Sequence, residues 1–187
     1  MGRPKLLLPL GKTTVLEQVL SALRSAGVEE ILVVVAPDGD ALAHLAAAAQ
    51  AHILRLAADT PDMHVTCVHG LAWIEDHFHP TKADGWLLLP ADHPTLRPDV
   101  VRALVAAAPE DAEKTIIVPT HAGRRGHPTW LQWSHLAAIR ALSPNQGLNA
   151  FIRSRTAETR ELPWPSDEIL RDLDTPEDYQ RLQHPGQ

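Results

Sequence analysis

The sequence predicts an α/β fold, a Rossmann-like three-layer αβα sandwich in which helices cover both faces of a mostly parallel sheet. Short apolar runs at Ile31–Val35 and Trp86–Leu89 end at proline or turn residues, which is typical of strands buried on both faces. Amphipathic helical patterns separate these runs, and such an alternation favours βαβ units with right-handed crossovers. The 187 residues are expected to form a single domain, 1–187.

The first half of the chain carries the clearest helix signals. Thr14 and Glu17 have the spacing of a capping box, and Gly27 suits the end of the helix that they begin. Asp40 is expected to cap a second helix. The elements expected in this half are helices over 13–26, 40–50 and 63–77, and strands over 31–35 and 52–56.

The second half continues the alternation and then changes rhythm. A strand over 115–118 is expected to end at Pro119, and a polar, basic loop follows at 121–128. Thr175 can cap the last helix, with Pro176 at its first position. The other elements expected here are strands over 86–89, 129–133 and 159–162, the last at a sheet edge, and helices from Pro98, over 134–142 and up to residue 155.

Composition excludes several classes of protein. A formal net charge of -6 argues against a general nucleic-acid binder, which needs a basic face, but allows a small anionic ligand. Cys67 is the only cysteine, so an intrachain disulfide is excluded. With no apolar run of membrane-spanning length and no secretory leader, we expect no membrane association and a cytoplasmic protein.

Three charged residues are candidates for chemistry, because ligands of open α/β sheets bind outside the carboxyl ends of the strands. Asp92 directly follows an apolar strand, although a turn acid or helix cap would also explain it. Asp174 precedes the last helix, where an acid also favours the helix N-terminus. Two such carboxylates suit Mg²⁺ shared with phosphate groups. Lys5, between two prolines, suits charge developing on a phosphate, or is simply a solvated terminal residue.

The basic loop at 121–128 is the fourth candidate. Arg124 and Arg125 flank glycines beside His127 and Pro128, so the loop is either an ordinary solvated turn or a grip on an anionic substrate.

Taken together, four segments resemble the MobA-like nucleotidyltransferases, and in particular the molybdenum-cofactor cytidylyltransferases. They are GRPKLLLPLGKTTVLEQVLSALRSAGVEEILVVV, WLLLPADHPTLRPDVVRAL, IIVPTHAGRRGHPTW and DLDTPEDYQRL, in the order of the family. The resemblance implies the nucleotide-diphospho-sugar transferase type of fold and two substrates, a nucleoside triphosphate and a phosphorylated acceptor. It also implies Mg²⁺, CTP as co-substrate, transfer of CMP to molybdenum cofactor with release of pyrophosphate, and a molybdoenzyme or maturation protein as partner.

The resemblance also assigns roles to residues of this chain. Lys5 and Asp92 match the catalytic positions, and Asp92 and Asp174 match the metal-binding acids. The nucleotide side is implied for Arg3, Lys5 and Thr66, and the acceptor side for Arg124, Gly126, His127 and Pro128.

The chain departs from the family pattern at four places, one of them Asp62-Met63 and Thr66, where the family tends to show a Gly-Met turn followed by Ser. It begins at the methionine of L-A-A-G-x-S-x-R-M-G-x-P-K, so the family's first strand and most of its nucleotide loop have no counterpart, and two strands with unpaired edges and a gap in the sheet are expected. A start placed too late is the favoured explanation, beside a trimmed chain or divergence. The Gly-Asp-Gln-Pro element reads Ala91-Asp92-His93-Pro94, and Asn149 stands at a family arginine. A non-catalytic cofactor-binding or chaperone-like protein that keeps the acceptor pocket is therefore the alternative.

Overall fold

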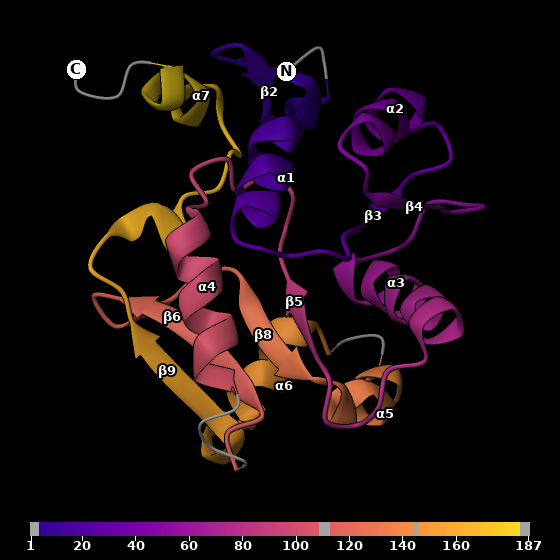
Figure 1. Ribbon diagram of the computed structural model, residues 1–187, viewed down its shortest axis with the longest axis vertical. Coiled ribbons are helices and arrows are strands. Elements are labelled where there is room, and N and C mark those ends of the chain that lie inside the picture. The colour runs from indigo at the N-terminus through magenta and orange to yellow at the C-terminus, as the bar shows by residue number, and fades with distance from the viewer. Residues whose placement is uncertain (1–3, 109–112, 144–145, 184–187) are drawn as a thin grey trace.

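The computed structural model describes residues 4–108, 113–143 and 146–183 (Figure 1). Its helices are α1 Val15–Ser25, α2 Asp40–Ala48, α3 Met63–Phe78, α4 Pro98–Ala107, α5 Leu136–Arg140, α6 Leu148–Ser154 and α7 Pro176–Gln183. Its strands are β1 Pro9–Leu10, β2 Thr13–Thr14, β3 Leu32–Val35, β4 His52–Arg55, β5 Gly85–Leu88, β6 Ile116–His121, β7 Arg124–Arg125, β8 Thr129–Gln132 and β9 Thr159–Pro163. The expected helices and strands are present in the expected order, together with three short strands that were not expected, β1, β2 and β7.

The strands form two main sheets. β3 and β4 are a parallel pair, and β5, β8, β6 and β7 follow one another in a second sheet in which β9 also pairs with β6. β5 and β6 are both antiparallel to β8, so they run in one direction, which β9 shares. β9 pairs only with β6 and is the edge strand that the sequence predicts. Within the second sheet only β7 and β8 run against the common direction.

Helices cover both faces of the second sheet, so the predicted three-layer sandwich is confirmed. Side chains alternate along β6: Ile117 packs in one apolar cluster with α1 and α4, whereas Ile116 and Val118 pack in another with α3, α5 and α6. Figure 1 shows α4 on the near face of β6 and β8, and α6 behind them. Two separate cores on opposite faces of one sheet are the expected consequence of fully apolar strands.

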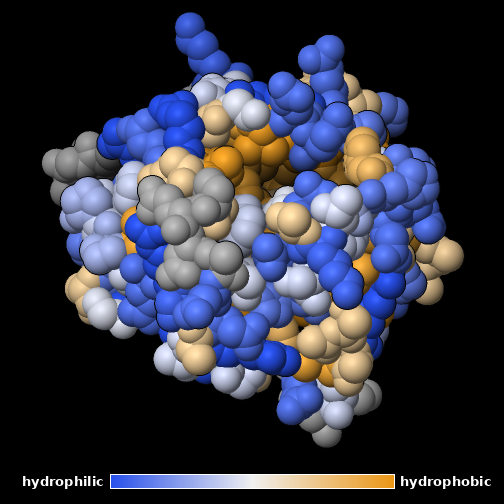
Figure 2. Space-filling model, turned by 60° about the horizontal axis from the view of Figure 1, so that its bottom comes forward, coloured by the Kyte–Doolittle hydropathy of each residue, from blue (hydrophilic) through white to orange (hydrophobic). Residues whose placement is uncertain are grey.

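The two sheets do not hydrogen-bond to each other through any described residue. β3 pairs with β4 alone, and β5 pairs with β8 alone. Leu32–Val34 and Trp86–Leu88 are consequently only half-buried, so the prediction that these runs are buried on both faces is wrong for their side chains. The expected gap between two unpaired strands is present, although Val33 and Leu87 pack against the same core. Figure 2 shows a hollow with hydrophobic walls on one face of the molecule.

Four local predictions also need correction. Gly39, not Asp40, occupies the N-cap of α2, and the Asp40 carboxylate accepts a hydrogen bond from Arg55. β6 continues through Pro119, which has no N–H to donate but whose carbonyl oxygen accepts a hydrogen bond from the amide of Gly126. The predicted basic loop is a hairpin formed by β6 and β7. The helix expected over 134–142 is a 3-10 turn at Trp133–His135 followed by α5.

Of the helices in the described ranges, none has both the length and the apolarity needed to cross a lipid bilayer.

Candidate functional site

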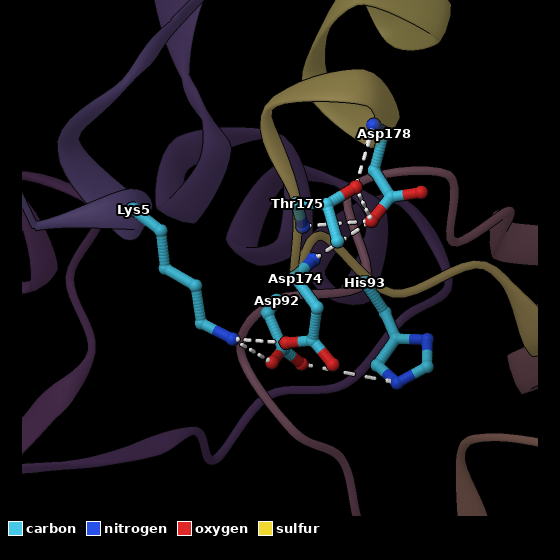
Figure 3. Close-up of polar contacts among 6 residues, drawn as sticks. All are labelled: Lys5, Asp92, His93, Asp174, Thr175 and Asp178. Atoms are coloured by element: carbon cyan, nitrogen blue, oxygen red, sulfur yellow. Dashed lines mark hydrogen bonds and ion pairs between the residues drawn. The ribbon is translucent and has the colours of Figure 1, made fainter. Parts of the chain in front are cut away.

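The backbone of Lys5 is held near the N-terminal end of α1 by a short turn. It opens a 3-10 turn, Lys5–Leu7, directly after Pro4, and the amide of Val15 donates to the carbonyl of Leu8, which ties this turn to the helix. The capping box that the sequence predicts at Thr14 is present in full. The lysine backbone is therefore fixed, while its four-carbon side chain extends away from the turn (Figure 3).

Asp92 and Asp174 come from segments far apart in the sequence. Asp92 lies four residues beyond β5, and its carbonyl oxygen accepts a hydrogen bond of 2.9 Å from the amide of Leu173, a fully buried side chain. Asp174 precedes α7, where the Asp178 carboxylate accepts from the amides of Asp174 and Thr175 at 3.2 and 2.8 Å. These backbone bonds hold the two carboxylates beside each other.

The three predicted charged residues meet at one point (Figure 3). The Lys5 ammonium lies 2.6 Å from Asp92 Oδ2 and 2.8 Å from Asp174 Oδ1. Burial lowers the pKa of Lys5, but hydrogen bonds and charge attraction to Asp174 and Asp92 outweigh it, so the pKa is higher than usual. The lysine therefore carries its full positive charge at neutral pH.

A cleft of about 370 Å³ adjoins this cluster and contains most of the predicted acceptor-side residues. Its lining includes Asp92, His93, Arg124, Arg125, Gly126 and His127, together with Met63, Pro90, Ile169, Leu170 and Asp172. Arg125 Nε donates to Glu161 at 2.9 Å, which leaves Arg124 as the better candidate to bind an anion. Pro128 is buried and does not line the cleft, so the structure does not bring it to the site.

Two histidines in the cleft wall were not predicted as a pair. The rings of His93 and His127 lie 5.0 Å apart in an edge-to-face arrangement, and burial lowers the pKa of both. The pKa of His127 falls to about 4. Both Nδ1 atoms are buried without a hydrogen-bond partner in the structure. The sequence signals were the position of His93 directly after Asp92 and the acceptor-side assignment of His127.

Thr66 lies apart from the other predicted residues. It is in the first turn of α3, where its hydroxyl group hydrogen-bonds with that of Thr60, and it lines a second pocket of about 250 Å³ with β3 residues Val34 and Val35. Arg3, the other residue predicted for the nucleotide side, lies outside the described residues.

The two carboxylates have the chemistry of a divalent-ion site. Asp92 Oδ1 is buried and has no hydrogen-bond partner, and each aspartate already faces a cation, the Lys5 ammonium. No cluster of three or more metal-ligating side chains occurs among residues 4–108, 113–143 and 146–183. Mg²⁺ suits such a site, because it commonly takes one or two carboxylates and completes its shell with phosphate oxygens and water.

An α/β sandwich with two carboxylates and a lysine beside a cleft that contains two arginines has side chains suited to binding phosphate groups and a divalent ion. The model of the family described as "MobA-like NTP transferase domain" matches residues 1–160, and the chain belongs to that family. It is thus a member of a family of nucleotidyltransferases.

Relatives agree with this assignment. A phosphoenolpyruvate guanylyltransferase from Sphaerobacter thermophilus is 29% identical over 176 residues, which cover 90% of this chain and 77% of the relative. The structure of Rv0371C from Mycobacterium tuberculosis H37Rv in complex with manganese superposes with a TM-score of 0.78 at 27% identity, covering 97% of this chain and 92% of the other. A cytidylyltransferase from Leptospira borgpetersenii shares the fold, with a TM-score of 0.76 at 17% identity, over 96% of this chain and 78% of its own.

Proposed function

We propose that this protein transfers a nucleoside monophosphate, CMP from CTP, to a phosphorylated acceptor such as molybdenum cofactor and releases pyrophosphate, with Mg²⁺ bound at Asp92 and Asp174. The observation that carries the proposal is the contact of Lys5 with both carboxylates at the rim of the cleft that contains Arg124. Within one region, Lys5 supplies a cation, the two carboxylates supply ligands for a metal ion, and Arg124 supplies a binding group for an anion. The proposed partner, which would take up the product, is a molybdoenzyme or its maturation protein. The proposed location is the cytoplasm.

The reaction needs positioning and charge neutralisation more than covalent chemistry. An oxygen of the acceptor phosphate forms a bond to the α-phosphorus of the triphosphate. The bond from that phosphorus to the bridging oxygen breaks, and pyrophosphate leaves with the bonding electrons. Bound Mg²⁺ would supply positive charge to the phosphate oxygens as this happens.

The roles of the chain's own residues follow from their chemistry. Lys5 neutralises the negative charge that develops around the α-phosphorus, since a lysine ammonium is a compact point charge. Asp92 and Asp174 would hold the divalent ion, since carboxylate oxygens are the ligands that Mg²⁺ prefers. Arg124 binds the acceptor phosphate, and Thr66 lines the pocket next to β3 for the nucleoside.

A second candidate differs in both substrates. The Sphaerobacter relative is named for guanylyl transfer to phosphoenolpyruvate, and its 29% identity over 176 residues is the observation that favours GTP and a small phosphorylated acid. The basic side chain of Arg124 at the cleft suits a carboxylate as well as a phosphate.

The test is a pyrophosphate-release assay in which each triphosphate is paired with each acceptor. With Mg²⁺ present, CTP with molybdenum cofactor is expected to release pyrophosphate faster than GTP with phosphoenolpyruvate. The reverse order would select the second candidate. Acceptor binding without release for any pair would instead favour the non-catalytic cofactor-binding or chaperone-like protein.

A matched pair of variants ties the activity to the site. Asp92→Asn is expected to lower kcat by about 100-fold or more, because it removes a charged ligand where the transition state needs it. Asp76→Asn makes the same change at an exposed position of α3 and should leave kcat unaltered. An Asp92→Asn protein with undiminished kcat would contradict the assignment of this carboxylate.

A further inference from the structure

The Lys5 ammonium lies between two carboxylates that the proposed function reserves for a metal ion. Its Nζ contacts one oxygen of each, Asp92 Oδ2 at 2.6 Å and Asp174 Oδ1 at 2.8 Å. An ion bridging the same two carboxylates must also lie between them. One cation therefore excludes the other from this position.

The remaining oxygen of Asp92 does not provide a second binding position for the ion. Asp92 Oδ1 is buried on the side of His93, whose Nε2 is 3.8 Å away, and it has no hydrogen-bond partner. The oxygen of Asp92 that is not buried in this way is Oδ2, and Lys5 lies on it. A cation that binds Asp92 through Oδ2 and also contacts Asp174 Oδ1 therefore takes the position that Lys5 occupies.

Charge counting shows when each cation is favoured. Two carboxylates and one ammonium leave a single negative charge, whereas an added divalent ion that did not displace Lys5 would make the cluster positive. Like charges a few ångströms apart repel strongly even at the effective dielectric of a protein surface. A triphosphate removes this penalty, because its oxygens can take the ammonium and complete the shell of the ion.

The Lys5 side chain can move from the carboxylates to a bound triphosphate. Its backbone is fixed by the 3-10 turn after Pro4, but its side chain is 36% exposed and has four rotatable carbon–carbon bonds. Asp174 is 61% exposed, so the contact that must break first is open to solvent. Moving the ammonium requires only rotamer changes.

Resting on the proposed function, we infer that Lys5 and a divalent ion compete for the position between Asp92 and Asp174, and that a triphosphate decides the competition by drawing the ammonium onto its phosphates. Lys5 thereby makes metal binding depend on nucleotide binding. The same side chain then stands ready to neutralise charge on the phosphates. Metal without a triphosphate binds weakly, and metal with a triphosphate binds tightly.

The test is titration of Mn²⁺ by calorimetry and by electron paramagnetic resonance of the free ion, without acceptor and hence without turnover. Lys5→Met and Lys5→Gln are expected to bind Mn²⁺ about tenfold more tightly than the unaltered protein, since they remove the competing charge. Addition of a non-hydrolysable CTP analogue should tighten Mn²⁺ binding more in the unaltered protein than in either variant. Thermal unfolding provides a second readout, in which Mn²⁺ raises the Tm of the Lys5 variants more than that of the unaltered protein.

Lys82→Met is the matched control. Lys82 is exposed in the loop before β5, at the opposite end of that strand from Asp92, so its loss lowers the net charge equally without touching the site. It should bind Mn²⁺ like the unaltered protein.

Two results overturn the inference in distinguishable ways. If Mn²⁺ binds to the unaltered protein but no more tightly to either Lys5 variant, the competition is absent and the metal site stands. If Mn²⁺ binds to none of these proteins, with CTP or GTP analogues present, the metal site fails and the proposed function fails with it.

Discussion

Gly126 lies against the backbone of Ile169 so closely that a β-carbon at position 126 would be 2.4 Å from the Ile169 carbonyl oxygen. That oxygen also accepts a hydrogen bond of 2.8 Å from the amide of His127. The contact joins the hairpin after β6 to the segment that leads to Asp174. The geometry of the cleft therefore depends on the absence of a side chain at Gly126.

Gly126→Ser is expected to destabilise the protein by about 1–3 kcal/mol, because the new side chain must push the Ile169 backbone away. Gly147→Ser is the matched control, since nothing lies within 4 Å of a β-carbon there and serine suits the N-cap of α6. Urea unfolding measures both. Equal free energies of unfolding for the two variants would contradict the close approach.

Acid should weaken the fold through His127. Burial, and then repulsion from His93, lowers the pKa of His127 to about 4, whereas the unfolded histidine has a pKa of about 6.5. Between these values the unfolded chain binds a proton that the folded chain does not. The free energy of unfolding therefore falls as the pH falls from about 6.5 to about 4, by at most about 3 kcal/mol from this group.

His127→Asn should flatten that pH dependence, as measured by urea unfolding at steps from pH 7 to pH 4. The same substitution at His44, exposed on α2, should leave the slope unaltered. If the slope in His127→Asn is as steep as in the unaltered protein, another group is responsible.

The free edge of β3 predicts a contrast between two valines. Val118 on β6 is 2% exposed, so Val118→Thr buries a hydroxyl group and should cost about 1–3 kcal/mol. Val33 on β3 is half-buried beside an unpaired edge, so the hydroxyl of Val33→Thr can reach water, and the cost should stay below about 1 kcal/mol. Urea unfolding of both variants compares them. Equal costs would mean that β3 is covered in solution.

Sequence reasoning succeeded where the determining interactions are local or follow from the class of fold. Thr14 and Glu17 are three residues apart, and their capping box depends on that spacing alone. Lys5, Asp92 and Asp174 could be placed together because the carboxyl ends of strands in an open sheet meet at one edge.

It failed where the partner of a residue is remote in the sequence. The direction of β8 is set by its neighbours β5 and β6, which no pattern within Thr129–Gln132 reveals. The pairing of His93 with His127 likewise depends on how β5 and the hairpin pack. Apolar runs predict burial, but only the arrangement of strands shows that one edge of β3 pairs with no strand among the described residues.

The two adjacent arginines of the cleft should have different roles. Arg125 is committed to Glu161, whereas Arg124 lines the cleft with no salt bridge to any residue that the structure describes. If Arg124 binds the acceptor phosphate, Arg124→Met should raise the KM for the acceptor by roughly 10- to 100-fold, the worth of one or two charge-assisted hydrogen bonds, and leave the KM for the triphosphate unchanged. Steady-state kinetics with each substrate varied in turn measures this. Arg153→Met, at an exposed position of α6, should alter neither constant, and an equal rise in both constants for Arg124→Met would show that Arg124 does not distinguish the acceptor.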